Sequence, residues 1–284
     1  MFEFLELVVA GLFLGVTYGL LAIPISILFV STDKVDLAVG AYAVLAAAVA
    51  ANTPEPFSIV AGLLASCAAA AVVGLISTAL DRRPHQDPMA AVLASFGFAL
   101  FLESLVLTLY GKNPFIRQLF STFWSVTGLR VSPQAPINFS IAVMLIGGLY
   151  VLLYRTGWGR DMRASAANQR GALLAGIPVA LMQMSAFLIA GLLAGVAGIL
   201  ILYSTGVEFA AGLHLTLVGF GAAILFGLHS PIRGFVGGLV IGVVEALGNG
   251  YLTGFAAHAA PLIVMFVVLC FGRTSLEQVR GGRA

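Results

Sequence analysis

Long apolar runs constrain this chain more than any other feature, because they recur along nearly its whole length with only short polar breaks. Hydrophobic residues make up 60% of the chain and charged residues only 9%, which lies outside the range of soluble domains. A helix that crosses a bilayer needs roughly 20 mostly apolar residues. The runs give nine candidate spans: 5–30, 37–51, 58–80, 89–110, 137–154, 181–204, 213–228, 234–250 and 256–271.

Some of these runs are short for a simple spanning helix, as is common for helices broken by Gly or Pro near a transport path. The sequence therefore predicts an all-α integral membrane protein, a polytopic bundle of about 8–10 transmembrane helices. Because no loop is long enough for a globular domain, we expect one transmembrane domain over residues 1–284.

The basic residues predict the orientation of this bundle, because cytoplasmic loops carry an excess of Lys and Arg. With the N-terminus outside, only three of the 14 basic residues fall outside, all in the 111–136 loop. The others fall inside: Lys34, Arg82, Arg83, Arg155, Arg160, Arg163, Arg170, Arg233, Arg273, Arg280 and Arg283. The pattern predicts a cytoplasmic C-terminus, with residues 81–88 and 155–178 also in the cytoplasm.

Sequence motifs for nucleotide hydrolysis, zinc-dependent hydrolysis and nucleophilic catalysis are absent from the chain. The four histidines lack metal-ligand spacing, and Cys67 and Cys270 lie within apolar runs, which favours small core residues over a disulfide. A net charge of +2 is too small to indicate a nucleic-acid partner. We expect no enzymatic activity and no metal or cofactor in this chain, so uphill transport would need an ion gradient or another subunit.

Three acidic residues keep an ion-coupled secondary carrier open as an alternative. Glu103 and Glu245 lie within spans, and Asp36 precedes the second span. Ionisable groups deep in a membrane commonly mark ion pathways, but no Lys or Arg within the spans accompanies these acids. A structural or channel-like membrane protein is the third possibility.

Glycines recur every fourth residue in two of the candidate spans. They are Gly11, Gly15 and Gly19 in the first span, and Gly234, Gly238 and Gly242 in the eighth. Small residues at this spacing let helix backbones approach closely in a bilayer. We predict that these six glycines pack helices against each other.

One polar segment, 155–177, interrupts the apolar pattern after the fifth span. From Arg160 to Ala175 it is rich in Ala and Leu and has no proline, which favours a single helix. One face of that helix would carry Met162, Ala166, Gln169 and Leu173. Gly176 marks its C-terminal end. The segment is either an anchor on anionic lipid headgroups or a docking surface, with small side chains for close approach and arginines at the rim.

This segment resembles the permease subunits of branched-chain amino acid ABC importers, the Liv type. The matching positions are Thr156, Gly159, Arg160, Arg163, Ala164, Ala172, Gly176 and Ile177. Two further blocks agree in order along the chain, through Gly15 and Tyr18 and then through Phe220, Gly227, Gly234, Gly237, Gly238, Gly242 and Glu245. "VDLAVGAY" departs from the family pattern, since Asp36, Val39 and Ala41 stand where Asn, His and Glu are usual.

The resemblance implies one of two permease subunits, identical or paralogous, in a bacterial inner membrane. Two cytoplasmic ATP-binding subunits and an extracytoplasmic solute-binding protein would complete the importer, with ATP bound only by the partners. Residues expected to couple the bundle to the ATPases are Arg160, Arg163, Ala166, Ala167 and Gly176. Residues expected along the substrate path are Tyr18, Asp36, Gly40, Ser95, Phe220 and Glu245. Branched-chain amino acids are the expected solutes, and the departures leave amides, urea and aromatic acids open.

Overall fold

The computed structural model describes residues 2–32, 34–81, 88–117, 124–126, 129–131, 133–228, 230–252 and 255–271. In this part of the chain the fold is helical, with one short β-hairpin. Its elements are α1 (Phe2–Thr32), α2 (Val39–Asn52), α3 (Ser58–Asp81), α4 (Pro88–Tyr110), β1 (Trp124–Val126), β2 (Leu129–Val131), α5 (Gln134–Arg155), α6 (Gly157–Ala167), α7 (Gln169–Leu174), α8 (Val179–Ser204), α9 (Ala211–Leu225), α10 (Pro231–Tyr251) and α11 (Phe255–Phe271).

Each of the nine predicted spans is found as a helix, with small shifts at the ends. Six of these helices, α1, α3, α4, α5, α8 and α10, are long and apolar enough to cross a membrane. α2 and α9 are shorter apolar helices of 14 and 15 residues. The prediction of a polytopic helical membrane protein is confirmed.

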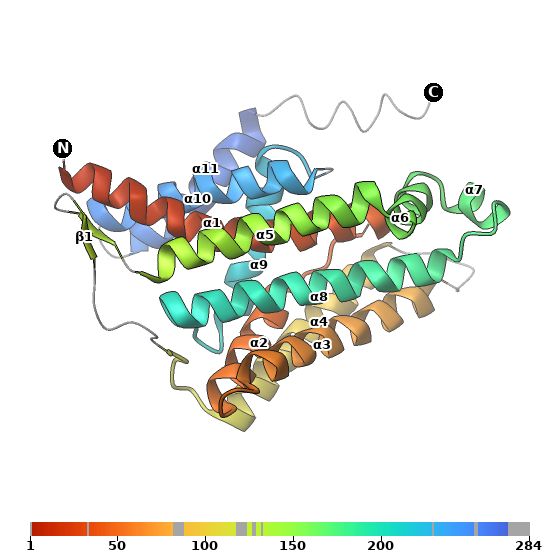
Figure 1. Ribbon diagram of the computed structural model, residues 1–284, viewed down its shortest axis with the longest axis horizontal. Helices are drawn as coiled ribbons and strands as arrows, with labels where there is room; N and C mark the ends of the chain where they lie inside the picture. The colour runs from red at the N-terminus through yellow and green to blue at the C-terminus, as the bar shows by residue number, and fades with distance from the viewer. Residues whose placement is uncertain are drawn as a thin grey trace.

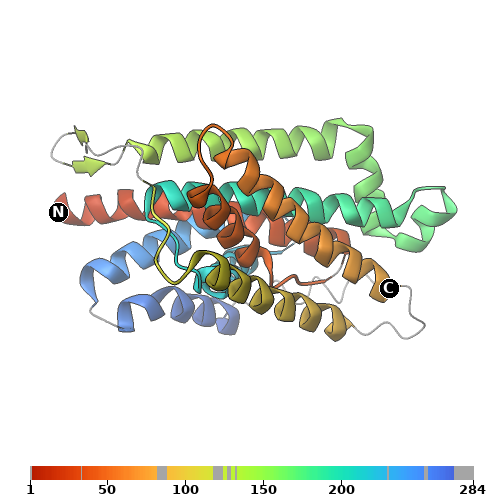
Figure 2. The ribbon, with the colours of Figure 1, turned by 90° about the horizontal axis from the view of Figure 1, so that it is seen from below.

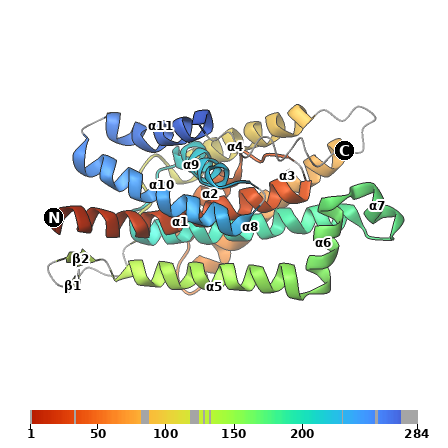
Figure 3. The same ribbon diagram turned by 90° about the horizontal axis from the view of Figure 1, so that it is seen from above.

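The long helices run side by side, and the polar segment lies at one end of them. α6 and α7 are at the end of the bundle opposite to the N-terminus and the β-hairpin (Figure 1). Figure 2 shows the same separation from below. α6 runs across the end of the bundle, and α9 is seen nearly end-on, so it crosses the direction of the long helices (Figure 3).

The predicted cytoplasmic loop 81–88 is largely outside the described residues, but the helix ends that flank it are described. The end of α3 and the start of α4 lie toward the same end of the bundle as α6 and α7 (Figure 1). Consecutive spans cross a membrane in opposite directions, so the two predicted cytoplasmic segments, 81–88 and 155–178, must lie at the same end of the bundle.

Among the cysteines, Cys67 is a free, half-buried thiol on α3, while the side chain of Cys270 lies outside the described part of the chain.

The two glycine series lie at one helix contact, where α1 crosses α10. A Cβ atom added to Gly15 would lie 2.6 Å from the Cα atom of Leu239, and one added to Gly11 would lie 2.6 Å from the Cα atom of Val243. A Cβ atom on Gly238 would overlap the backbone of Gly19. The two backbones therefore touch directly, which side chains larger than hydrogen would prevent.

The single helix predicted over 160–175 is wrong, because the segment forms two helices that break at Asn168. The backbone of Asn168 is extended, with φ −156° and ψ 99°, and its side chain accepts a hydrogen bond from the Gly171 N–H at 2.9 Å. Asn is more favourable as an N-cap than inside a helix, because its side chain satisfies a free N–H of the first turn. The predicted helix face is lost with the break: the buried residues are Met162, Ser165 and Ala172.

The predicted end of this segment at Gly176 is confirmed. Gly176 has φ +81°, a left-handed conformation that glycine adopts without a steric penalty. Its N–H donates to the Leu173 carbonyl at 3.1 Å, and the Ile177 N–H donates to the Ala172 carbonyl at 2.9 Å. These two bonds form a Schellman motif, which satisfies the last carbonyls of α7.

Candidate functional site

A buried polar turn joins α1 to α2 inside the bundle. Asp36 is only 5% exposed. One of its carboxylate oxygens accepts from the Ala38 N–H at 2.8 Å, and the other accepts from the Tyr42 hydroxyl at 2.9 Å. The Leu37 N–H donates to the Ser95 hydroxyl oxygen at 3.1 Å. The structure thus brings two of the predicted path residues, Asp36 and Ser95, together at the start of α2.

α9 packs directly on this turn, through a threonine that the sequence analysis missed. The Thr216 hydroxyl oxygen accepts from the Gly40 N–H at 2.9 Å. The same oxygen lies 3.1 Å from the Leu37 carbonyl and 3.0 Å from the Gly212 carbonyl, and its proton can be donated to either. A Cβ atom on Gly40 would lie 2.7 Å from the Thr216 nitrogen, so glycine permits the close approach of α2 and α9. A single threonine within an apolar span was the available signal, since such side chains often bond across helices.

Replacing Thr216 with valine, which has nearly the same shape, should destabilise the protein. Valine cannot accept from the Gly40 N–H, and a buried donor left unsatisfied costs about 1–3 kcal/mol. The measurement is the thermal midpoint of the purified chain in detergent. Thr78→Val is the matched control, because among the described residues the exposed Thr78 hydroxyl bonds only to the Leu75 carbonyl within its own helix. Equal midpoints for the two variants would contradict the role assigned to Thr216.

A second buried polar group lies between α1 and α10. Tyr18 is 5% exposed and Glu245 is 9% exposed, and the two side chains are close enough to interact electrostatically. One oxygen of the Glu245 carboxylate has no hydrogen-bond partner among the described residues. Phe220, the remaining predicted path residue, is half-buried on α9, one helical turn after Thr216. Five of the six predicted path residues therefore lie in two buried groups: Asp36, Gly40 and Ser95 at the start of α2, and Tyr18 and Glu245 between α1 and α10.

The predicted coupling segment begins with a tight turn after α5. The Thr156 side chain caps α6 by accepting from the Gly159 N–H at 3.1 Å. A Cβ atom on Gly159 would lie 2.6 Å from the Cα atom of Leu153, so only glycine allows α6 to turn back this closely. The Trp158 indole N–H donates to the Ser185 hydroxyl on α8 at 3.3 Å. These contacts attach α6 to both α5 and α8.

The residues predicted to couple are accessible at this end of the bundle. Arg160, Arg163, Ala167 and Gly176 are exposed, and Ala166 is half-buried. The guanidinium of Arg163 lies 4.6 Å from the centre of the Tyr154 ring, a typical cation–π distance. α7 also exposes two leucines: Leu173, which the sequence placed on the predicted helix face, is 60% exposed, and Leu174 is 92% exposed. Small and apolar side chains flanked by arginines suit a protein-binding surface.

A comparison with known proteins identifies the family to which this chain belongs. Residues 7–271 match the model of a family described as "Branched-chain amino acid transport system / permease component". The chain belongs to this family. The family is a transport permease component rather than an enzyme, and it works in a transport system with other subunits. Membership confirms the resemblance seen in the sequence, and it supports the permease rather than the ion-coupled carrier that Asp36, Glu103 or Glu245 would serve.

Relatives of this family member include permeases from an archaeon and from bacteria. The probable branched-chain amino acid transport permease protein LivH of Methanocaldococcus jannaschii is 30% identical over 274 residues, covering 88% of this chain and 85% of the relative. The high-affinity branched-chain amino acid transport system permease protein LivH of Salmonella typhimurium is 25% identical, covering 97% of this chain and 98% of the relative. The L-arabinose transport system permease protein AraH of Escherichia coli is 26% identical but covers only 49% of this chain and 44% of the relative.

Proposed function

We propose that the chain is a membrane-spanning permease subunit of an ABC importer in a bacterial inner membrane. It forms, as one transmembrane domain, the path for a small polar solute, most directly a branched-chain or related amino acid. Relatives named for branched-chain amino acids align over most of both chains, whereas the arabinose permease aligns over about half. This difference in coverage supports an amino acid over a sugar.

The importer needs partners that supply what this chain lacks. Two cytoplasmic ATP-binding subunits would bind the ATP, a second permease subunit would complete the path, and an extracytoplasmic protein would deliver the solute. The observation that carries this proposal is the exposed surface of α6 and α7 at one end of the bundle, which carries Arg160, Arg163 and Arg170 and follows Arg155 at the end of α5. A basic surface at a helix-bundle end also supports a cytoplasmic location for that end and an outside N-terminus.

The same contacts suggest how closure of the ATPases would reach the membrane. α6 is attached to α5 by the Thr156 cap and to α8 by the bond from Trp158 to Ser185. α8 in turn packs against α1, α2 and α3. A displacement of α6 would therefore act on the helices that surround the polar turn at Asp36, which changes access to the path.

Purification of the tagged chain from cells that also produce the candidate partners tests the proposal. We expect ATP-binding subunits to copurify, and the reconstituted complex to take up labelled leucine only with ATP and the binding protein present. Uptake by the chain alone under a proton gradient would instead establish the carrier.

The orientation is tested in the same cells with Asn168→Cys in a background without Cys67 and Cys270. Labelling of position 168 by an impermeant thiol reagent in intact cells would place this end outside.

A further inference from the structure

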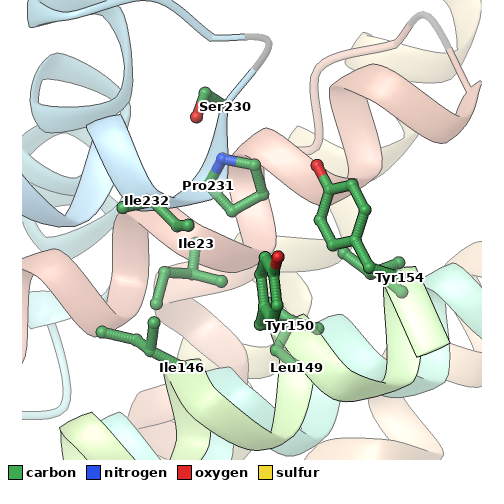
Figure 4. Close-up of a pocket in the computed structure, with 9 residues that line it drawn as sticks. Ile23, Ile146, Leu149, Tyr150, Tyr154, Ser230, Pro231 and Ile232 are labelled. Atoms are coloured by element: carbon green, nitrogen blue, oxygen red, sulfur yellow. The ribbon is translucent and has the colours of Figure 1, made fainter.

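A groove opens between α1, α5 and the start of α10, at the end of the bundle where α6 lies. One part of its lining consists of aliphatic side chains, among them Ile23, Ile146 and Leu149. The other part carries hydroxyl groups, from Tyr150, Tyr154 and Ser230. Figure 4 shows the two tyrosine hydroxyls directed toward Pro231 and Ser230, with Ile23 and Ile146 toward the other side. The groove therefore has a polar end and an apolar end.

Positive charge is concentrated at the polar end of this groove. The Arg163 guanidinium lies 4.6 Å from the ring centre of Tyr154, so a fixed cation stands beside one wall. α10 starts at Pro231, and its first free N–H groups carry the partial positive charge of a helix N-terminus. The N-cap Ser230 makes no capping bond with its side chain, which leaves its hydroxyl available. Asp161 on α6 contributes one negative charge, which is outweighed by the positive charges of Arg160, Arg163 and Arg170 on α6 and α7.

The position of the groove along the helices matches the boundary between membrane and water. Tyr154 is the residue before Arg155, at which α5 ends, and α6 then crosses the end of the bundle. Tyrosines favour this boundary because the ring is apolar and the hydroxyl is polar. Ile146 and Leu149 lie one to two turns further inside, at the depth of acyl chains.

We propose that this groove binds an anionic phospholipid of the leaflet on the α6 side. The headgroup phosphate is held by the hydroxyls of Tyr150, Tyr154 and Ser230 beside Arg163, and an acyl chain lies along Ile23, Ile146 and Leu149. Hydrogen-bond donors and positive charge dominate the polar end of the groove. This end therefore favours an anionic headgroup over a zwitterionic one. Because Arg163 lies on α6 beside Tyr154, while the groove is lined from α1, α5 and the start of α10, the bound lipid bridges the coupling segment and the bundle.

Native mass spectrometry of the purified full-length chain tests this site with added phosphatidylglycerol or phosphatidylcholine. We expect phosphatidylglycerol to be retained preferentially. Arg163→Gln should weaken its binding about fivefold, as for the loss of one arginine near a phosphate. Arg160→Gln is the matched control, since it removes the same charge from an exposed position of α6, and it should leave binding unchanged. Leu149→Trp should fill the groove and reduce binding, whereas Met144→Trp, on the exposed face of α5, should not.

Several results would overturn the proposal. Equal retention of the two lipids would show that the groove does not select an anionic headgroup. Equal losses in Arg163→Gln and Arg160→Gln would show diffuse charge attraction without a site. Displacement of phosphatidylglycerol by excess inorganic phosphate would show that the pocket holds a free anion rather than a lipid. A two-chain species that binds no lipid and is disrupted by Leu149→Trp would show that a second copy fills the groove. The measurement needs no transport activity, so it can fail while the proposed function holds.

Discussion

Replacing Ala167 with arginine should abolish the stimulation of ATP hydrolysis by the solute-loaded binding protein, and uptake should stop with it. Ala167 is the last residue of α6 and is exposed, so a large side chain there leaves the packing of the bundle intact. It would, however, keep an ATPase subunit from seating on the small residues of this surface. Coupling between two sites is typically worth about 1–3 kcal/mol, and its loss would make basal and stimulated hydrolysis equal. The reconstituted complex, assayed with and without the binding protein, provides the measurement.

Ala167→Ser is the matched control for this experiment, because it keeps a small side chain at the same position. Stimulation should survive in this variant. The folded state of both variants is checked by their thermal midpoints, which should equal that of the original chain. If Ala167→Arg kept full uptake and stimulation, α6 would be an anchor on lipid headgroups, where an added arginine is tolerated.

Gly238→Leu should prevent correct assembly of the bundle. A side chain at this position would overlap the backbone nitrogen and Cα atom of Gly19 on α1, and backbone cannot rotate away as a flexible side chain can. Overpacking usually costs about 1–3 kcal/mol and occasionally more. We expect the upper part of that range, because α1 contacts α8, α9 and α5 as well as α10 and cannot shift alone. The fraction of monodisperse protein in detergent and its thermal midpoint should both fall.

Gly147→Leu on α5 is the matched control, since it makes the same change where, among the described residues, the added Cβ meets no atom within 4 Å beyond its own stretch of helix. Leucine is a better helix former than glycine by roughly 0.7–1 kcal/mol, so this variant should be as stable as the original chain or slightly more stable. A Gly238→Leu protein as stable as Gly147→Leu would mean that α1 and α10 do not meet along their glycines.

The apolar runs by themselves determined the places of the apolar helices in the described part of the chain, that is, of all its helices except α6 and α7. A segment of some 20 apolar residues must satisfy its backbone hydrogen bonds internally inside a bilayer, and a helix does this without any other segment. The glycine spacing likewise pointed to close helix contacts, because a missing side chain has few other uses in a lipid-facing sequence. The end of the polar segment at Gly176 was also predictable, since a left-handed residue after a helix is commonly glycine.

The break at Asn168 was not predictable from helix propensity alone. Alanine and leucine on both sides favour a continuous helix, and one asparagine costs a helix only a few tenths of a kcal/mol. The tertiary structure nevertheless favours a break over a continuous helix. α6 crosses the end of the bundle, and α7 must then turn back so that α8 can start at Val179. The extended backbone at Asn168 supplies that change of direction, and its side chain offsets the lost helix bond.

Only the tertiary structure decided which polar residues meet. Asp36 and Ser95 are 59 positions apart, and Gly40 and Thr216 are 176 apart; no local pattern links residues at such distances. The sequence alone marked Asp36 and Glu245 as path residues and kept Glu103 only for the carrier alternative, without indicating the partners of any of them. Packing then separated them, placing Asp36 in a satisfied network at the start of α2 and Glu245 beside Tyr18 with one oxygen unpaired. The apolar pattern thus determined which segments enter the membrane, while the close contacts of α1, α2, α9 and α10 decided where the polar groups inside it lie, because a buried polar group must find its partner on another helix.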